Sequence, residues 1–187
     1  MTRAPLILAS RSPQRRAILE QLGIPFVVRA PQVEELEAGP PDEVAVENAY
    51  RKAAAVASAD AGGRVLAVDT VVCIGRRMYG KPADADQARR TLRALAGRRH
   101  AVIGGLCLIE GGRWRTATST TLVDFRALDE TVIDWYLASN EWRERAGGYA
   151  VQGRGAALVA SIEGDYLNVV GLPLATLLAL APELLTS

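Results

Sequence analysis

Apolar and polar positions follow two different periods along the chain, and each change of period marks a predicted element. Short apolar runs bounded by polar residues predict buried strands at 6–9 and 25–29. Longer runs predict strands at 65–74, 101–109, 116–125 and 156–162. Apolar residues at helical spacing predict helices at 13–22, 42–60, 84–96, 129–139 and 172–185.

Local signals mark where several of these elements begin and end. Ser12 is a good N-cap, Pro13 suits a first helical position, and Gly23 stops the helix. Gly111 and Gly112 predict a turn that joins two long strands. The uncharged segment 166–182 is shorter than a membrane span and is interpreted as a strand, a turn and a buried helix. No membrane partner is therefore expected.

Helices and strands alternate, with a hairpin in the middle of the chain. This order predicts an α/β fold with a mixed sheet. No Pro- or Gly-rich linker divides the sequence, so residues 1–187 are predicted to form a single domain.

Composition and charge narrow the functional classes. Hydrophobic residues make up 49% and charged residues 23%, as in globular proteins. Lys and Arg total 22 and Asp and Glu total 21, and a net charge of +1 argues against binding of a nucleic-acid polymer. A small anionic ligand stays compatible with this balance. The first apolar run is too short for the apolar region of a signal peptide.

Asp69 interrupts an otherwise apolar strand. A carboxylate in such a strand is costly unless it is paired or binds a metal. Asp69 is therefore a candidate metal ligand or general base. The structural alternative is that one strand ends and a turn begins at this residue.

Two segments place cations beside features that suit phosphate. Residues 10–16 follow a predicted strand and open a helix, so free backbone N–H groups form an anion site to which Arg15 adds charge-assisted bonds. Lys81 stands between Gly80 and Pro82, on a stiff and closely approachable backbone. An ordinary capped helix and a solvent-exposed lysine are the alternatives.

Other polar residues are less specific taken alone. Glu34 in its acidic loop and Lys52 on its helix have solvated surface charges as their default interpretation. His100 is the only histidine and is interpreted as structural, so no histidine-based triad is predicted. Together the carboxylates, the cations and the amide-rich helix start are the groups that a metal-bridged cleavage of a phosphate bond needs.

Six motifs in the same order resemble the Maf nucleotide pyrophosphatases, also called septum formation inhibitor proteins. The resemblance covers nearly the whole chain, and each motif is weak alone while the ordered set is specific. The motifs are Leu-Ala-Ser-Arg-Ser-Pro-Gln-Arg-Arg at 8–16, Val-Glu-Glu at 33–35, Asp-Thr-Val-Val at 69–72, Gly-Lys-Pro at 80–82, Gly-Tyr-Ala-Val-Gln-Gly-Arg-Gly at 148–155, and Ile-Glu-Gly-Asp-Tyr-Leu-Asn-Val-Val-Gly-Leu-Pro-Leu at 162–174.

The resemblance implies a long mixed sheet with flanking helices and two lobes around a cleft, similar to inosine triphosphate pyrophosphatases. It implies a cytoplasmic enzyme that hydrolyses the α–β phosphate bond of a nucleoside triphosphate, giving the monophosphate and pyrophosphate. It also implies Mg²⁺ or Mn²⁺ as cofactor, and homodimers, which family members often form. Hard carboxylate oxygens without a histidine or thiolate cluster suit these metals rather than Zn²⁺.

The resemblance also assigns functional residues. Asp69, Glu34 and Lys52 are expected to be catalytic, with Asp69 as proton acceptor for the attacking water, and Glu34 and Asp69 as metal ligands. Substrate contacts are expected from Ser10, Gln14, Arg15, Thr70, Lys81 and Gln152.

One branch of the family prefers dTTP and UTP, and another prefers 7-methyl-GTP. Thr70 and Gln152 resemble the pyrimidine branch. Gln14 departs from it, because that branch usually has Arg at this position and the methyl-GTP branch has Trp. Gln14 either meets the base or merely occupies the first helical turn.

A second function stays open on the sequence alone. The protein could be a nucleotide-binding regulator of cell division or septum formation with little turnover. The presence of Glu34, Lys52, Asp69 and Lys81 favours an enzyme, because a binder needs no base.

Overall fold

The structure is a computed structural model, and it describes residues 6–58 and 63–185. Its helices are α1 (Pro13–Gln21), α2 (Pro41–Ala57), α3 (Ala85–Leu95), α4 (Glu130–Leu137), α5 (Tyr166–Val170) and α6 (Leu174–Leu180). Its strands are β1 (Leu6–Leu8), β2 (Phe26–Val28), β3 (Arg64–Ile74), β4 (Arg77–Tyr79), β5 (Arg99–Glu110), β6 (Arg113–Phe125) and β7 (Val159–Glu163). Short 3₁₀ segments cover Ala146–Gly148, Gly153–Leu158 and Pro182–Leu185.

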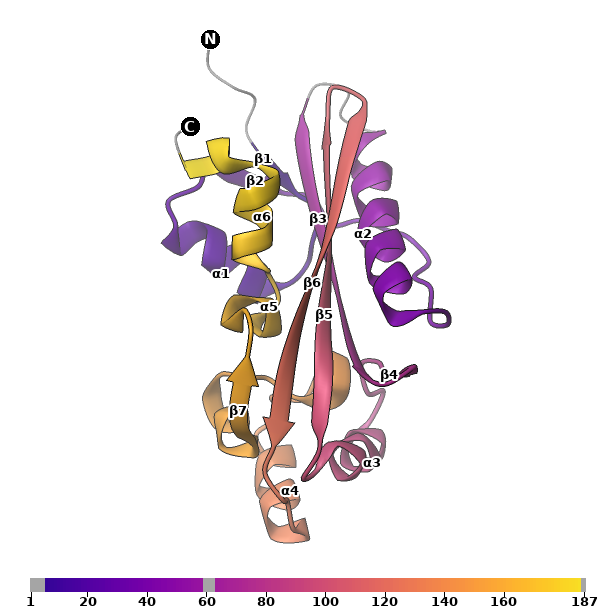
Figure 1. The fold of residues 1–187 in the computed structure, drawn as a ribbon, viewed down its shortest axis with the longest axis vertical. Coiled ribbons are helices and arrows are strands. Elements are labelled where there is room, and N and C mark those ends of the chain that lie inside the picture. The colour runs from indigo at the N-terminus through magenta and orange to yellow at the C-terminus, as the bar shows by residue number, and fades with distance from the viewer. Residues whose placement is uncertain (1–5, 59–62, 186–187) are drawn as a thin grey trace.

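The strands of the described residues form one mixed sheet in the order β2-β1-β3-β5-β6-β7, with β4 paired to the end of β3. The β1–β2 and β1–β3 pairs are parallel, whereas the pairs from β3 to β7 are antiparallel. The long strands β5 and β6 run along most of the molecule's length (Figure 1). The predicted α/β fold with a long mixed sheet and flanking helices is confirmed.

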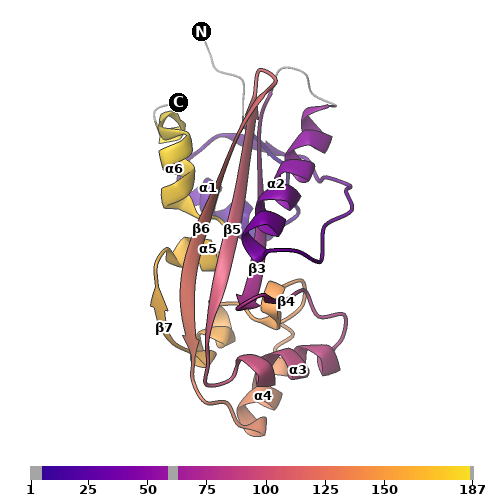
Figure 2. The same ribbon diagram turned by 45° about the vertical axis from the view of Figure 1, so that its right-hand side comes forward.

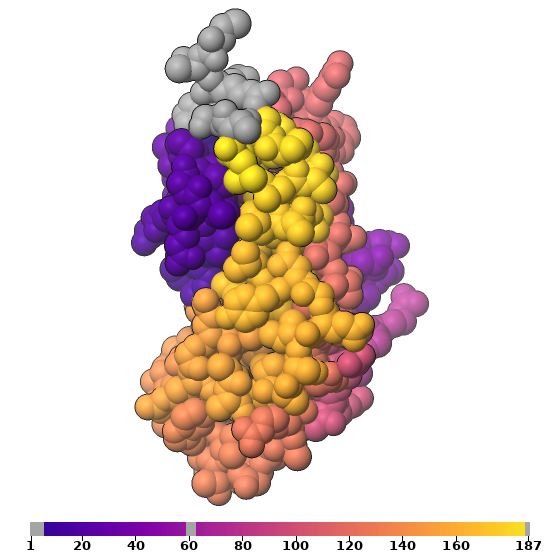
Figure 3. Space-filling model, turned by 60° about the vertical axis from the view of Figure 1, so that its left-hand side comes forward, coloured from indigo at the N-terminus to yellow at the C-terminus, as the bar shows by residue number. Residues whose placement is uncertain are grey.

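Alternate side chains of the strands pack against two different layers of helices. Leu6 and Leu8 pack with residues of α1 and α6 on one face, and Ile7 packs with the alanines of α2 on the other. Figure 2 shows α2 on the opposite side of the sheet from α6. The C-terminal α6 lies beside the N-terminal part of the chain (Figure 3), so the two ends of the sequence share one core.

The molecule has two lobes along its length (Figure 1). The upper lobe holds β1, β2, α1, α2 and α6. The lower lobe holds β4, α3, α4, β7 and the 3₁₀ segments Ala146–Gly148 and Gly153–Leu158. A separate core of the lower lobe gathers Leu92, Phe125, Tyr136, Trp142 and Tyr149. The expected two-lobed shape is therefore confirmed, and the single-domain organisation stays a prediction.

Most predicted elements are confirmed, and so are the residues that were expected to begin or end them. The Ser12 side chain accepts the backbone N–H of Arg15 as the N-cap of α1, and Gly23 after the helix has a φ of 66°. Asp84 and Asp129 cap α3 and α4 in the same way. The predicted end of the second helix at 59–60 lies outside the described residues.

The C-terminal part departs from the predictions. The segment 166–182 is predicted to begin with a strand, but it begins with α5, because the Asp165 carboxylate accepts the backbone N–H groups of Leu167 and Asn168. The predicted strand at 156–162 begins only at Val159. The predicted last helix divides at Pro182, which has no N–H to donate. Strand β4 was not predicted. Among the described residues, no helix is long and apolar enough to cross a membrane.

Candidate functional site

A cleft of about 940 Å³ opens between the lobes. Its upper wall, as used below, consists of Ser10, Gln14, Arg15, Glu35, Lys52, Asp69 and Thr70. Its lower wall consists of Lys81, the segment 143–146, Tyr149 and Gln152. The structure thus brings together all the predicted site residues except Glu34.

The centre of the upper wall is a cluster of charges, in which Asp69 and Lys52 are buried and Glu35 is exposed. Asp69 and Lys52 are 7% and 8% exposed, and the Lys52 Nζ lies 2.5 Å from Asp69 Oδ1. The same Nζ lies 3.0 Å from Glu35 Oε1. A single ammonium therefore joins two carboxylates, which resolves the cost of burying a charge on a strand.

Small residues bring α2 close enough to the sheet for this contact. Gly105 stands opposite Asp69 in the β3–β5 ladder. A Cβ at Gly105 would lie 2.2 Å from the carbonyl oxygen of Ala45, so the helix packs directly on the strand. Ala45 and Ala49 are fully buried on the same helix. This close packing lets Lys52, which lies one turn after Ala49, reach across to Asp69.

Asn48 is a buried residue that the sequence-based site did not include. Its Oδ1 accepts the backbone N–H of Leu36 at 2.7 Å, and its Nδ2 donates to the Leu36 carbonyl at 3.1 Å. The same Nδ2 lies 3.4 Å from Asp69 Oδ2. One amide therefore holds the loop next to Glu35 and contacts Asp69. Its position one turn before Lys52 was the available sequence signal.

Arg15 links three segments of the upper wall. Its Nε donates to the Gly171 carbonyl at 2.8 Å, one Nη to Ser10 Oγ at 3.0 Å, and the other Nη to Thr70 Oγ1 at 3.1 Å. Burial lowers the pKa of Arg15, and the charges of Asp69 and Glu35 act in the opposite direction. The guanidinium stays protonated, because an arginine titrates far above neutral pH.

Gln14 lines the cleft at the start of α1, where its Oε1 accepts the Ser12 hydroxyl at 3.1 Å. The Ser12 hydroxyl in turn caps the helix. This contact leaves the amide nitrogen of Gln14 as the group available to a ligand. Gln14 therefore both belongs to the first helical turn and faces the cleft.

The lower wall is fixed mainly through its backbone. The Gly147 N–H donates to the Gly80 carbonyl at 3.1 Å, which ties this segment to the turn that carries Lys81. Gly147 has a φ of 70°, and a Cβ there would lie 2.9 Å from the Val72 side chain. The Lys81 side chain is 56% exposed and lies 3.9 Å from Glu144, whose side chain is 89% exposed. Its ammonium is thus held only loosely.

Two side chains that do not line the cleft, Glu141 and His100, support the glycine-rich segment around Gln152. The Glu141 carboxylate accepts the backbone N–H groups of Arg154 and Gly155 at 3.1 and 3.2 Å. His100 Nε2 lies 2.8 Å from the Tyr149 hydroxyl, and burial lowers the pKa of His100 to about 4. The structural interpretation of His100 agrees with this buried contact. Neither Glu141 nor Tyr149 was predicted as part of the site.

Glu34 is placed differently from expectation. Its side chain is exposed and is not among the lining residues, and its carbonyl accepts a bond from Arg51 at 3.4 Å. Glu35 faces the cleft and contacts Lys52 instead. In an extended loop, neighbouring side chains point in opposite directions, and the sequence alone did not say which glutamate turns inward.

The cleft is more cationic than the whole protein. Its lining holds six cations against three carboxylates, whereas the chain carries +1 in total. The cations are Arg11, Arg15, Lys52, Lys81, Arg143 and Arg145, and the carboxylates are Glu35, Asp69 and Glu144. This excess of positive charge favours a polyanionic ligand.

Comparisons with known proteins identify a matching family and several similar chains. A family model described as Maf-like protein matches residues 5–184. A protein of Symbiobacterium thermophilum named dTTP/UTP pyrophosphatase is 47% identical over 171 residues, covering 90% of this chain and 88% of its own length. A Pyrococcus furiosus protein of the same name is 41% identical over 177 residues, covering 94% and 93%.

A solved structure, that of the Staphylococcus aureus Ham1 protein, is similar with a TM-score of 0.47 and 16% identity. The match covers 65% of this chain and 71% of that one.

Proposed function

The chain belongs to the Maf family of Maf-like proteins, and from this premise we propose that it hydrolyses nucleoside triphosphates to the monophosphate and pyrophosphate. The observation that carries the proposal is the Asp69–Lys52–Glu35 cluster in a cleft with an excess of cations. The alternative, a regulator with little turnover, is not favoured, because the curated relatives above are named as pyrophosphatases.

The reaction needs a base for water and cations for the polyphosphate. Asp69 takes a proton from the water whose oxygen bonds to the α phosphorus, while the bond to the α–β bridging oxygen breaks and pyrophosphate leaves. Lys52 and Asn48 each contact one oxygen of Asp69. Since a carboxylate offers about four lone-pair sites, an acceptor position is left for the water. Arg15 and Lys81 offset the negative charge of the phosphates.

The donor set also fits the proposed Mg²⁺ or Mn²⁺. Asp69 and Glu35 present hard carboxylate oxygens to the cleft. Among the described residues, no group of three or more His, Cys, Asp or Glu side chains gathers as a complete metal site. Mg²⁺ is commonly held by one or two carboxylates together with substrate phosphates, so this partial set is suitable. The metal would supply neutralisation and polarisation of the phosphoryl oxygens.

Product analysis tests the reaction. Wild type with Mg²⁺ and a nucleotide panel in ¹⁸O-water should release pyrophosphate, with the heavy oxygen in the monophosphate. Orthophosphate as the product would place the cut at the terminal phosphate and contradict the proposal. Heavy oxygen in the pyrophosphate would place the attack on the β phosphorus instead.

Metal titration separates the two neighbouring glutamates. Turnover should stop in excess EDTA and return with Mg²⁺, and full activity in EDTA would exclude the metal. Glu35→Gln should raise the Mg²⁺ concentration needed for half activity about 10-fold, because one hard ligand is lost. Glu34→Gln is the matched variant. If Glu34→Gln raised this Mg²⁺ concentration more than Glu35→Gln, then Glu34 would be the metal ligand, as predicted from the sequence.

We further propose that dTTP and UTP are preferred substrates. Thr70 is fixed by Arg15, and Gln14 and Gln152 offer amides that can pair with a pyrimidine edge. A kcat/KM panel of dTTP, UTP, CTP, GTP and 7-methyl-GTP tests this preference. Gln14→Arg should sharpen it, since a guanidinium offers more donors. A wild type that prefers 7-methyl-GTP would contradict the base assignment and leave the pyrophosphatase reaction intact.

A further inference from the structure

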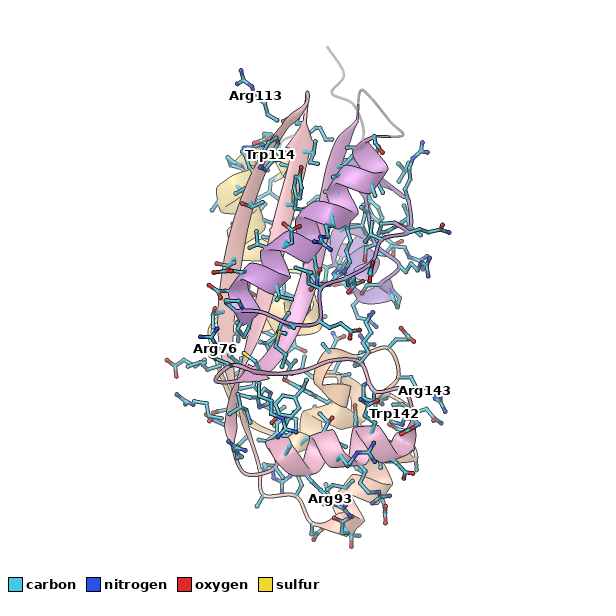
Figure 4. The ribbon with its side chains drawn as sticks, turned by 90° about the vertical axis from the view of Figure 1, so that its right-hand side faces the viewer. Arg76, Arg93, Arg113, Trp114, Trp142 and Arg143 are labelled. Atoms are coloured by element: carbon cyan, nitrogen blue, oxygen red, sulfur yellow. The ribbon has the colours of Figure 1, made fainter. Side chains whose placement is uncertain are left out.

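The cations of the cleft differ in what their side chains contact. Arg15 donates to three oxygen atoms, and Lys52 lies between two carboxylates. Lys81 is close to Glu144. Arg143 donates to Asn140 at 3.1 Å, and its guanidinium lies 4.6 Å from the ring centre of Trp142. Figure 4 shows Arg143 beside Trp142 in the lower lobe.

Arg145 differs from these cations in lacking a partner among the described residues, and from the exposed Arg11 in being half-buried. It lines the cleft and is half-buried, yet within residues 6–58 and 63–185 its side chain makes no hydrogen bond or ion pair. Burial lowers the pKa of its guanidinium, and the negative charge of Glu141 acts against this shift. Glu141 forms no ion pair with Arg145 within 4.0 Å among the described residues, and its two oxygens accept the backbone N–H groups of Arg154 and Gly155. A half-buried cation without an acceptor is unfavourable until an anion joins it.

The backbone around Arg145 is held in place. The carbonyl of Arg145 accepts the Gly148 N–H at 3.0 Å, and the Gly147 N–H bonds to Gly80. Gly148 has a φ of 65°, and a Cβ there would lie 3.0 Å from Pro82. These contacts place Arg145 beside the Gly80–Pro82 turn that carries Lys81. The two cations therefore share the lower wall.

We propose that Arg145 binds the polyphosphate of the substrate directly, which rests on the proposed pyrophosphatase function for the nature of that substrate. A guanidinium presents paired N–H donors that match two oxygens of a phosphate group. The bound polyphosphate supplies the acceptor that the protein itself does not provide to this side chain. Arg145 thus adds a contact to those proposed for Arg15 on the upper wall and Lys81 on the lower wall.

Binding of inorganic tripolyphosphate, measured by calorimetry without turnover, tests the assignment. Arg145→Gln should weaken its binding about 20-fold, since charge-assisted hydrogen bonds are lost. Arg145→Lys keeps the charge but loses the paired N–H donors, so it should bind about 4-fold more weakly than wild type and more tightly than Arg145→Gln. Arg113→Gln removes the same charge at the far end of the molecule, where Figure 4 labels it, and should change binding less than about 2-fold.

The outcomes separate this inference from the reaction itself. Unchanged tripolyphosphate binding in folded Arg145→Gln overturns the role of Arg145, and so does a wild type that does not bind tripolyphosphate. A Lys variant as weak as the Gln variant would also count against a charge contact. If wild type binds tripolyphosphate through Arg145 but cleaves no nucleotide, the contact stands and the proposed function fails. A KM raised alike for every nucleotide, with kcat less affected, supports a phosphate contact.

Discussion

The two walls of the cleft are built on opposite plans. On the upper wall, the side chains of Asp69, Lys52 and Arg15 bond to one another or to protein oxygens before any ligand arrives. On the lower wall, the backbone is tied down, while the cationic side chains of Lys81 and Arg145 point to the cleft with weak partners or none among the described residues.

This difference matches two different tasks. The proposed proton transfer to Asp69 depends on atoms held within a fraction of an ångström, so the bonded and buried pair of Asp69 and Lys52 is suitable. Attraction of a polyphosphate depends on charge and tolerates movement of a flexible side chain. We infer that the upper wall carries the chemistry and that the lower wall mainly contributes affinity.

The largest expected effect is the loss of the base. Asp69→Asn keeps the shape and can still accept from Lys52, but it cannot take a proton. Pyrophosphate release should fall about 10³-fold, whereas tripolyphosphate binding should stay within a few-fold of wild type. Asp86→Asn, an exposed change on α3, is the control. A variant as active as wild type would remove Asp69 from the role of base and break the division of tasks between the walls.

The next effect concerns the support beneath the lower wall. His100 is buried against Tyr149, and its pKa falls from an ordinary 6.5 to about 4. Because the unfolded chain binds the proton more tightly, stability is full above pH 6.5 and is lost as pH falls towards 4. The loss should reach roughly 3 kcal/mol.

Denaturant unfolding between pH 4 and 7 measures this dependence. His100→Gln can still bond to the Tyr149 hydroxyl and does not titrate, so its stability should vary less over this range. The chain has one histidine, which makes the assignment direct. Equal slopes in both proteins would mean that His100 does not carry the dependence.

Much of the fold could be predicted because its signals are local. Ser12 and Gly23 bracket α1, and the apolar runs of β3, β5 and β6 are long. The failures arise where a tertiary contact decides. Residues 166–170 are apolar enough for a strand, yet the Asp165 cap and the buried Asn168 side chain, which bonds to Val102, select a helix.

The site was predictable where one residue type is unusual in its setting. Asp69 on an apolar strand is such a case. The choice between Glu34 and Glu35 was not, because it depends on how Asn48 holds the loop. Arg145 was also missed, since an arginine in a charged segment looks like a surface residue until its burial is known.

A smaller effect is expected from replacing Asn48, the amide that holds Leu36 and contacts Asp69 on the upper wall. Asn48→Leu keeps the volume but leaves both backbone groups of Leu36 without their partner and removes the contact with Asp69. We expect kcat/KM to fall about 30-fold, because Glu35 and Asp69 are no longer held together. Glu47→Gln on the same helix is the control. If only the melting temperature changed, Asn48 would be structural rather than a positioning residue.

The smallest expected effect is at Glu141, which supports the lower-wall segment around Gln152. Glu141→Gln replaces one of the two oxygens that accept the Arg154 and Gly155 N–H groups, so the segment around Gln152 should loosen. KM for dTTP should rise about 5-fold, since a partly exposed hydrogen bond contributes about 1 kcal/mol. Tripolyphosphate binding should stay equal or become tighter, because a carboxylate near Arg145 is removed.

These opposite responses distinguish Glu141 from Arg145. Loss of the Arg145 side chain should weaken the binding of both dTTP and tripolyphosphate. Glu20→Gln, on the exposed face of α1, is the matched control for removal of a carboxylate. A parallel loss of affinity for dTTP and for tripolyphosphate would mean that Glu141 acts through the whole lower lobe. The two walls would then differ less than their hydrogen bonds indicate. Recognition of the nucleotide base and binding of the phosphates would both depend on the structure of the lower lobe.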